Sequence, residues 1–308
     1  MDEEVAIRTC DTLFCGFCLV AQGFIRNEIR LTKDVKPLKE RPPHPPLRGP
    51  PSPLGKAYKP QFIHENIKEQ KMEQIYTIPV NEAFEKSAED KSCGCAFCTL
   101  YNKLENDELE LILGASMMEP DVRIKTNEKG FCRIHYDMMF TRKNRLGMAL
   151  TLESHLDELK KELRDGGLSA GSGKKPIARI GELEKNCYVC ERISFNFAHM
   201  VETAVLLWES DENFPAKLKA QPYFCLPHYR MMLEYAQKRL NKKVLKDFVK
   251  DCEEIQNTYI ETLKEDVSWF CKKFDYRYNE EPWYNSKDSV ERSMKFLRSD
   301  IHKQEKGK

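Results

Sequence analysis

Apolar side chains recur at helical spacing along most of this chain from Met72 onward. Segment 97–113, FCTLYNKLENDELELIL, places apolar residues three and four positions apart with acidic residues on the other face, as an amphipathic helix does. The same spacing predicts long helices over 133–164 and 242–274. Strand-like alternation is almost absent. We therefore expect an all-α protein, a helical bundle.

The second half of the chain repeats the plan of the first. Residues 114–130 carry Gly, Pro and Asn signals and predict a loop between two helices, and residues 209–224 predict the matching loop. Helices are expected from Cys187 before the second loop and from Leu226 after it. The bundle is therefore predicted to consist of two duplicated helix-loop-helix halves plus C-terminal helices.

The last predicted helix begins at Asp288-x-x-Glu291, which resembles a capping box. Its apolar residues fall on one face: Val290, Met294, Leu297 and Ile301.

Composition divides the chain into five parts. These are a Pro-rich extension expected to be disordered (1–71), a first half (72–165), a flexible linker (166–176), a second half with C-terminal helices (177–301) and a disordered tail (302–308). The extension is either a proline-rich recognition segment or no native part of the protein. We favour the second interpretation, because Lys68-Glu69 can be encoded by a purine run of the kind that precedes bacterial start codons, which puts the natural start at Met72. Native peptides from before Lys68 would contradict it.

A rare pattern of Cys and His occurs twice. GFCRIHYDMM (130–139) and YFCLPHYRMM (223–232) share Phe-Cys-x-x-His-Tyr-x-Met-Met, and a CxxC pair precedes each. The matched pairs are offset by 92 and 93 residues, which indicates internal duplication. The eight residues are Cys95, Cys98, Cys132 and His135 in the first half, and Cys187, Cys190, Cys225 and His228 in the second.

These pairs suit a metal. Two side chains three positions apart at a helix start point the same way, and two such pairs supply three thiolates and an imidazole, a set typical of tetrahedral zinc. We predict two zinc sites, each closed within its own half, because local loop closure costs less chain entropy. Cys95 and Cys98 would then meet Cys132 and His135.

Other interpretations of the eight residues remain open. They could be buried free cysteines beside satisfied histidines, ligands of iron–sulfur clusters, or thiol redox pairs. Cys93 could replace Cys95 as a ligand, although Lys185 occupies the matching position of the second half. A dinuclear carboxylate site is disfavoured by the order of its candidate residues, which are Glu110, Glu153, His155, His199 and Glu202.

Charge and hydropathy restrict the partners and the compartment. The net charge is +1, which does not favour nucleic acid even though residues 235–250 are locally basic. The absence of an 18-residue apolar run predicts no membrane span, and the absence of a secretion signal predicts a cytoplasmic protein. Twelve cysteines in that compartment favour metal or thiol chemistry over disulfides.

Residues 269–292 concentrate aromatic side chains among charged ones. Such a segment, which includes Trp269, Tyr276 and Trp283, either packs the last helix onto the bundle or docks a protein or small-molecule partner.

The doubled Cys/His pattern also carries a resemblance. Together with IYTIPVNEAFE, MMEPDVRIKTNEKGFCRIHY, KNRLGMALTLESHL and FDYR…EPW, it is similar to a bacterial family catalogued only as a domain of unknown function, seen mainly in Gram-positive anaerobes. Some members carry the automatic label of an ABC-transporter substrate-binding protein, a label that the helical pattern does not support. The resemblance covers roughly 72–297 and implies no activity.

Closed four-ligand sets leave no open coordination position, so an enzyme is disfavoured. The sequence predicts a binding or scaffold protein with structural zinc. The alternative is an iron–sulfur or thiol-based oxidoreductase or redox sensor.

Overall fold

The computed structural model describes residues 61–164 and 171–303, with side chains from Ile75 onward. Over these residues the chain is helical and contains no strand, which confirms the all-α prediction. The helices are α2 (Gln61–Glu89), α3 (Ala96–Leu113), α4 (Pro120–Lys129), α5 (Arg133–Thr141), α6 (Arg145–Glu162), α7 (Lys174–Leu183), α8 (Tyr188–Ser210), α9 (Phe214–Lys219), α10 (Leu226–Arg239), α11 (Lys242–Lys272) and α12 (Ser289–Arg298). Within the described ranges no helix is both long and apolar enough to cross a bilayer.

The predicted extension and the predicted linker are only partly covered by the described residues. Most of the predicted extension, residues 1–60, lies outside the described residues, and from Gln61 the chain is helical. Much of the predicted linker, 166–170, also lies outside them, and α7 begins before the linker was expected to end.

The prediction of one long helix over 133–164 is wrong, because α5 ends at Thr141 and a separate helix, α6, begins at Arg145. Asn144 begins α6 as its N-cap, and its side-chain oxygen accepts a hydrogen bond of 2.8 Å from the backbone N–H of Gly147. An Asn at this position satisfies a helix-start N–H that would otherwise be unpaired, so it starts a new helix.

Both predicted loops contain a helix of their own. Helix α4 lies within 114–130 and α9 lies within 209–224, and each carries a proline in its first turn. Proline is compatible with that position because the N–H it lacks has no partner within the helix. The duplication is therefore visible in the fold, as α3–α4–α5 and α8–α9–α10.

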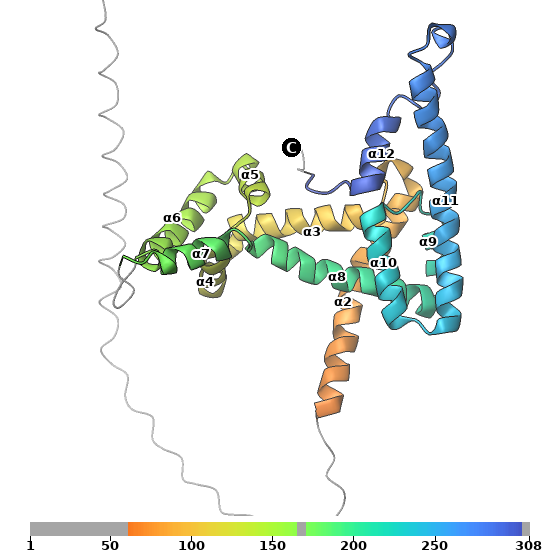
Figure 1. Cartoon of the computed structure of the whole chain (residues 1–308). Helices are drawn as coiled ribbons and strands as arrows, with labels where there is room; N and C mark the ends of the chain where they lie inside the picture. Colours follow the sequence, from red (N-terminus) through yellow and green to blue (C-terminus); the bar gives the residue numbers. More distant parts are fainter. Residues whose placement is uncertain (1–60, 165–170, 304–308) are drawn as a thin grey trace, which may run out of the picture. The chain divides into compact units, whose positions relative to one another are not determined.

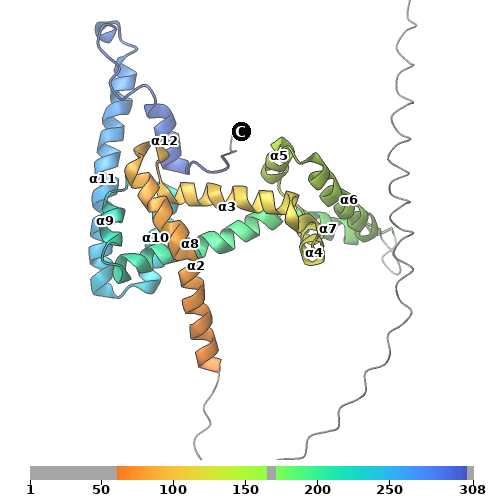
Figure 2. The same ribbon diagram turned by 180° about the vertical axis from the view of Figure 1, so that it is seen from behind.

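The first helices of the two halves, α3 and α8, pack side by side and run in opposite directions (Figures 1 and 2). Near the start of α3, the ring of Phe97 lies 6.3 Å from the ring of Phe197 in the middle of α8. Near the end of α3, Glu108 accepts a hydrogen bond of 3.1 Å from Arg192, which lies near the start of α8. The start of α8 therefore lies beside the later part of α3, and the start of α3 lies beside the middle of α8.

Four aromatic rings of the core gather where α2, α3, α9 and the chain before α10 meet. Phe84 is fully buried, with its ring 5.4 Å from Phe97, 4.9 Å from Phe214 and 6.1 Å from Phe224. Edge-on and tilted ring contacts of this kind add to the free energy gained by burying aromatic surface. This cluster fixes the start of α3 against the start of α10.

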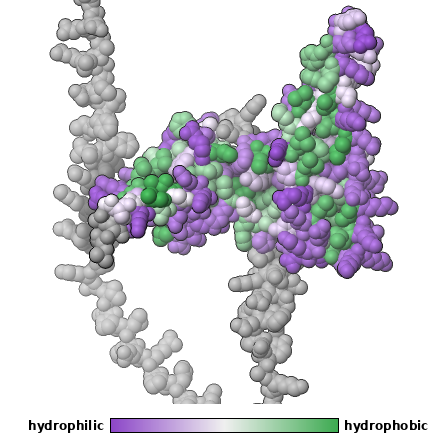
Figure 3. Space-filling view, viewed as in Figure 1, coloured by the Kyte–Doolittle hydropathy of each residue, from purple (hydrophilic) through white to green (hydrophobic). Residues whose placement is uncertain are grey.

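Not every apolar face is covered. On α12 the buried aromatic residue is Phe296, whereas Val290, Met294 and Leu297 are exposed. Apolar side chains also lie on the surface of α6 and α7, where Figure 3 shows apolar patches between polar ones, and they include Leu146, Leu156 and Ile177.

The predicted capping box is not formed. Asp288 precedes α12 as its N-cap, but its carboxylate makes no capping hydrogen bond and instead accepts one of 2.9 Å from Arg292.

The aromatic segment follows α11 and is held by a buried lysine. Lys273 is only 7% exposed, and its ammonium donates hydrogen bonds to the carbonyl oxygens of Tyr278, Asn279 and Glu281 at 2.6–3.0 Å. Three such bonds compensate the cost of burying the charge. The turn is thereby fixed, while Tyr276 on it is 83% exposed.

Candidate metal centres

All four Cys/His pairs lie at the starts of helices. The first cysteine of each pair is the N-cap of its helix, and its carbonyl oxygen accepts the first hydrogen bond of that helix at 2.8–3.2 Å. These N-caps are Cys95 of α3, Cys132 of α5, Cys187 of α8 and Cys225 of α10. The partial positive charge of a helix N-terminus favours the thiolate form that a metal requires.

Two glycines let the chain turn into these helices. Gly94 has φ 72° and Gly130 has φ 61°, with ψ values of −135° and −159°. Residues with a Cβ rarely adopt this conformation. A Cβ on Gly94 would also lie 2.7 Å from the hydroxyl oxygen of Tyr223. Close approach of the chain segments around the ligands therefore depends on glycine.

The first centre consists of Cys95, Cys98, Cys225 and His228. Nδ1 of His228 lies 3.1 Å from Sγ of Cys225, 3.5 Å from Sγ of Cys98 and 3.8 Å from Sγ of Cys95. The sulfurs of Cys98 and Cys225 are 3.6 Å apart. All four residues are buried.

The second centre consists of Cys132, His135, Cys187 and Cys190. Nδ1 of His135 lies 3.1 Å from Sγ of Cys132, 3.3 Å from Sγ of Cys187 and 3.4 Å from Sγ of Cys190. The sulfurs of Cys132 and Cys190 are 3.8 Å apart, and both of these cysteines are only partly buried. The same nitrogen of histidine thus faces three sulfurs in both centres.

The sulfur–sulfur distances match those of one four-coordinate ion in each centre, and most of the nitrogen–sulfur distances are shorter. Zinc–sulfur bonds of about 2.3 Å and zinc–nitrogen bonds of about 2.1 Å at tetrahedral angles place ligand atoms about 3.6–3.8 Å apart. The separations given above span 3.1–3.8 Å. A disulfide needs sulfurs about 2.05 Å apart, and the cysteines of the described residues are free.

The expected pairing within each half is wrong. Each centre takes its CxxC pair from one half and its CxxH pair from the other. The 18 residues of α3 extend about 27 Å and carry the chain away from Cys98 before Cys132 is reached. Because α8 runs antiparallel to α3, the start of α8 at Cys187 lies beside the later part of α3. Cys132, which follows α3 and α4 in the chain, lies close to Cys187 there. The saving in local loop entropy is outweighed by this helix packing.

Within each centre the thiols differ in pKa, because hydrogen bonds from neighbouring thiols stabilise one thiolate while other thiols stay protonated. Hydrogen bonds donated by Cys95 and Cys98 lower the pKa of the Cys225 thiol, whereas burial raises the pKa of Cys95 well above its ordinary value. In the second centre, a hydrogen bond from Cys190 lowers the pKa of Cys187 to about 3, and the pKa of Cys190 is raised by that bond. A divalent cation would stabilise all three thiolates of a centre at once.

The second centre is backed by a buried carboxylate. Nε2–H of His135 donates a hydrogen bond of 3.0 Å to Oε1 of Glu105, whose side chain is completely buried. Burial raises the pKa of Glu105, but hydrogen bonds from His135 and His302 outweigh it and keep the pKa below its ordinary value. A carboxylate behind a ligating histidine fixes the ring and its tautomer, so that Nδ1 faces the metal.

The first centre has an aromatic ring in the equivalent place. Phe197 lies 92 positions after Glu105, the offset that also relates Cys98 to Cys190. Its ring centroid is 5.0 Å from that of His228. Neither residue was predicted from the sequence, although an alignment of the two halves places the glutamate opposite the phenylalanine.

Residues 71–304 match the family of unknown function DUF6062, so the match covers most of the chain. The chain belongs to this family. No curated protein and no solved structure is detectably similar to it.

In this DUF6062 chain, a glutamine of α11 holds the backbone next to the first centre. Gln256 is buried and donates a hydrogen bond of 2.8 Å to the carbonyl oxygen of Phe224, and it accepts one of 2.9 Å from the N–H of the same residue. It thereby satisfies both backbone groups of the residue that precedes Cys225. This fixes the approach of the chain to α10.

The other candidate ligands do not join either centre. Cys93 is partly buried, and its thiol donates to a carboxylate oxygen of Asp90 at 3.6 Å. The residues of the dinuclear alternative are not brought together: Glu202 pairs with Arg239, and Glu110 pairs with Arg142.

Glu105, His135 and His302 form a third group of possible ligands. It shares His135 with the second centre, and its distances of 3.0 and 2.6 Å from Oε1 of Glu105 are ordinary hydrogen-bond lengths. We interpret this group as support for the second centre.

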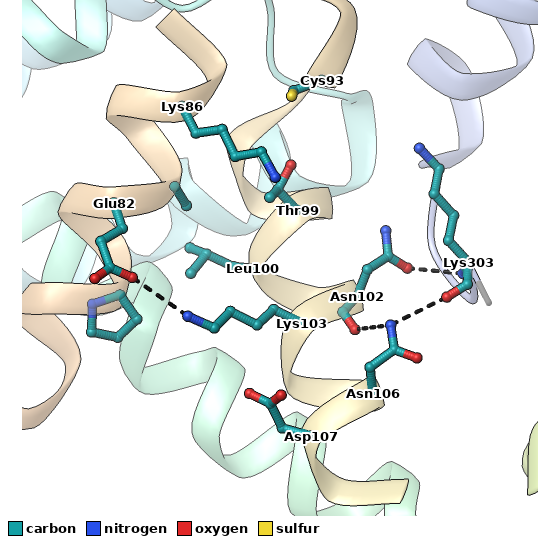
Figure 4. A pocket seen from close by; sticks show the side chains of 12 residues that line it. Glu82, Lys86, Cys93, Thr99, Leu100, Asn102, Lys103, Asn106, Asp107 and Lys303 are labelled. Carbon is teal, nitrogen blue, oxygen red and sulfur yellow. Dashed lines mark hydrogen bonds and ion pairs between the residues drawn. The ribbon is translucent and has the colours of Figure 1, made fainter. Parts of the chain in front are cut away.

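A cavity of about 600 Å³ lies between α2, α3 and Lys303 of this DUF6062 chain (Figure 4). The cavity is lined by apolar side chains such as Leu100 and by side chains of both charges. Among these, Lys103 and Glu82 form an ion pair of 3.4 Å. The mixed lining does not specify a ligand.

Proposed function

We propose that this DUF6062 chain is a non-enzymatic, zinc-stabilised helical protein of the bacterial cytoplasm that serves a binding or scaffold role. The observation that carries the proposal is the pair of closed Cys3His sets. Structural zinc sites are closed in this way, whereas catalytic zinc sites keep one position open for water or substrate.

The position of the ligands supports a structural role for the metal. Each centre joins the two halves, because its CxxC and CxxH pairs come from different halves. The free energy of metal binding is then free energy of association between the halves. Metal in the first centre would join the start of α3 to the start of α10, and metal in the second would join the start of α8 to the start of α5.

Zinc is favoured over an iron–sulfur cluster by distance. The sulfurs of Cys98 and Cys225 are 3.6 Å apart and those of Cys132 and Cys190 are 3.8 Å apart, as expected for ligands of one ion. Cysteines that bind different irons of a cluster have to lie farther apart. The Cys3His donor set is also frequent in structural zinc sites.

The binding role is assigned to the aromatic segment around Trp269, Tyr276 and Trp283. Tyr276 is 83% exposed on a turn that buried Lys273 holds in place. An aromatic side chain on a fixed turn has few rotatable bonds to order when a partner covers it, and aromatic residues often dominate binding interfaces. The partner would be a protein or a small molecule.

Metal analysis of anaerobically purified protein tests the proposal. We expect about two zinc ions per chain and colourless protein whose thiols react only after a chelator is added. Chelation should also reduce the helical circular dichroism signal and lower the unfolding temperature. Iron with a visible charge-transfer band would instead support the alternative of an iron–sulfur or thiol-based oxidoreductase or sensor.

A further inference from the structure

The chain after α12 returns to α3 and lies along it. We call residues 300–303 the C-terminal strap. The backbone on its path takes positive φ values at Ser299 (75°) and His302 (63°). Residues other than glycine adopt such values at an energetic cost, so the surrounding contacts have to hold them.

Two asparagines of α3 clamp the strap (Figure 4). Asn102 donates a hydrogen bond of 2.8 Å to the carbonyl oxygen of Asp300, and its own side-chain oxygen accepts one of 3.0 Å from the N–H of Lys303. Asn106 donates to the carbonyl oxygen of Lys303 at 3.3 Å. These bonds pair strap backbone groups with side chains one helical turn apart.

The strap reaches the first centre at one end. The backbone N–H of Asp300 points to Sγ of Cys98 at 3.4 Å. A metal-bound thiolate is a strong hydrogen-bond acceptor and a free thiol is a weak one, so metal in the first centre would strengthen this contact.

The strap reaches the second centre at its other end. Nδ1–H of His302 donates a hydrogen bond of 2.6 Å to Oε1 of Glu105, the same oxygen that accepts from His135. The ring of His302 also packs edge-on against Tyr101 at 5.7 Å. Metal in the second centre would fix His135 and, through their hydrogen bond, Glu105. The carboxylate of Glu105 would then be held where it accepts the hydrogen bond from His302.

One face of α3 therefore connects the two centres. Asn102, Glu105 and Asn106 lie four, seven and eight positions after Cys98 along the helix, and the strap contacts each of these four residues. We propose that the strap couples the two centres, so that metal in one centre orders the strap and thereby raises the metal affinity of the other. The inference rests on the proposed function only in taking both centres to bind metal.

A thermodynamic cycle on the full chain tests the coupling. Cys225→Ser disables the first centre, and His302→Phe removes the strap's donor to Glu105 while keeping an aromatic ring beside Tyr101. The zinc affinity of the second centre is measured by competition with a chromophoric chelator in four backgrounds: wild type, each single variant and the double variant. Arg298→Ala is the matched control, since this exposed residue ends α12 just before the strap.

In the wild-type background, we expect Cys225→Ser to weaken zinc binding at the second centre by about 5- to 150-fold, the usual range of coupling between sites. In the His302→Phe background the same substitution should have little effect, and Arg298→Ala should leave the coupling intact. Hydrogen exchange at the Asp300 amide should slow when zinc is added to the Cys225→Ser protein, because the second centre then orders the strap.

Equal losses with and without His302 would overturn the inference, as would two zinc sites that bind independently in the wild type. A chain that binds no zinc would overturn the proposed function and the inference together. Independent zinc sites would leave the proposed function standing, so the two failures are distinguishable.

Discussion

Glu105 of α3 and His135 of α5 form a 3.0 Å hydrogen bond in which both side chains are completely buried. A buried carboxylate is costly unless its partners stabilise it. Its second oxygen, Oε2, accepts no hydrogen bond from the described residues. The cost indicates that this bond matters to the second centre. The first centre has the same ligand types and Phe197 in place of the carboxylate.

Replacing Glu105 should therefore weaken one centre selectively. Glu105→Gln keeps the shape of the side chain and removes the charge that polarises the His135 ring, so zinc affinity at the second centre should fall about 10- to 100-fold. Chelator competition should show a smaller loss at the first centre, which Glu105 reaches only through the strap. The control is Glu110→Gln on the same helix, where the carboxylate is 67% exposed. Equal losses at both centres would contradict this role of Glu105.

The glycine before the first CxxC pair should be required for stability. Gly94→Ala places a Cβ at a φ of 72° and 2.7 Å from the hydroxyl oxygen of Tyr223, so the free energy of unfolding should fall by about 1–3 kcal/mol. Gly181→Ala is the matched control, because its Cβ would meet open space within α7. That change should raise stability by up to about 1 kcal/mol. Urea unfolding of the zinc-loaded proteins measures both, and equal effects of the two substitutions would exclude a special role for Gly94.

The sequence predicted the fold class and the residues of the two clusters, because helical periodicity and the spacing of Cys and His are local signals. It could not predict which pairs meet. Cys98 is joined to Cys225 instead of Cys132 because α3 and α8 pack antiparallel, and that packing depends on contacts between residues far apart in the chain. Asn144 was overlooked as a helix start because the apolar spacing continues on both sides of it. Glu105 resembled the solvated acids around it, and its burial depends on His135 and His302.

The aromatic core and the aromatic segment should respond differently to truncation. Phe97 is fully buried against four other rings, so Phe97→Ala should lower the free energy of unfolding by about 3–5 kcal/mol. Phe274 is 74% exposed, and Phe274→Ala should change it by about 0.5 kcal/mol or less. Thermal unfolding monitored by circular dichroism measures both. A large loss for Phe274→Ala would mean that the segment packs the bundle and does not dock a partner.

Gln256 should support the first centre from a distance. Gln256→Leu leaves the N–H and carbonyl of Phe224 buried without partners, which should cost about 1–3 kcal/mol for each group. Zinc affinity should fall more at the first centre than at the second, which the change affects only through the strap. The control is Gln237→Leu, an exposed glutamine on α10. If the two substitutions have the same effect on zinc binding, Gln256 does not position the ligands.

The zinc content of two double variants tests the crossed centres most directly. Cys98→Ser with Cys225→Ser removes two ligands of the first centre, whereas Cys98→Ser with Cys132→Ser removes one ligand from each centre. After extensive dialysis against a mild chelator, the first variant should retain about one zinc ion per chain and the second about none. The reverse result, one zinc in the second variant and none in the first, would show that each half closes its own centre and would contradict the crossed pairing.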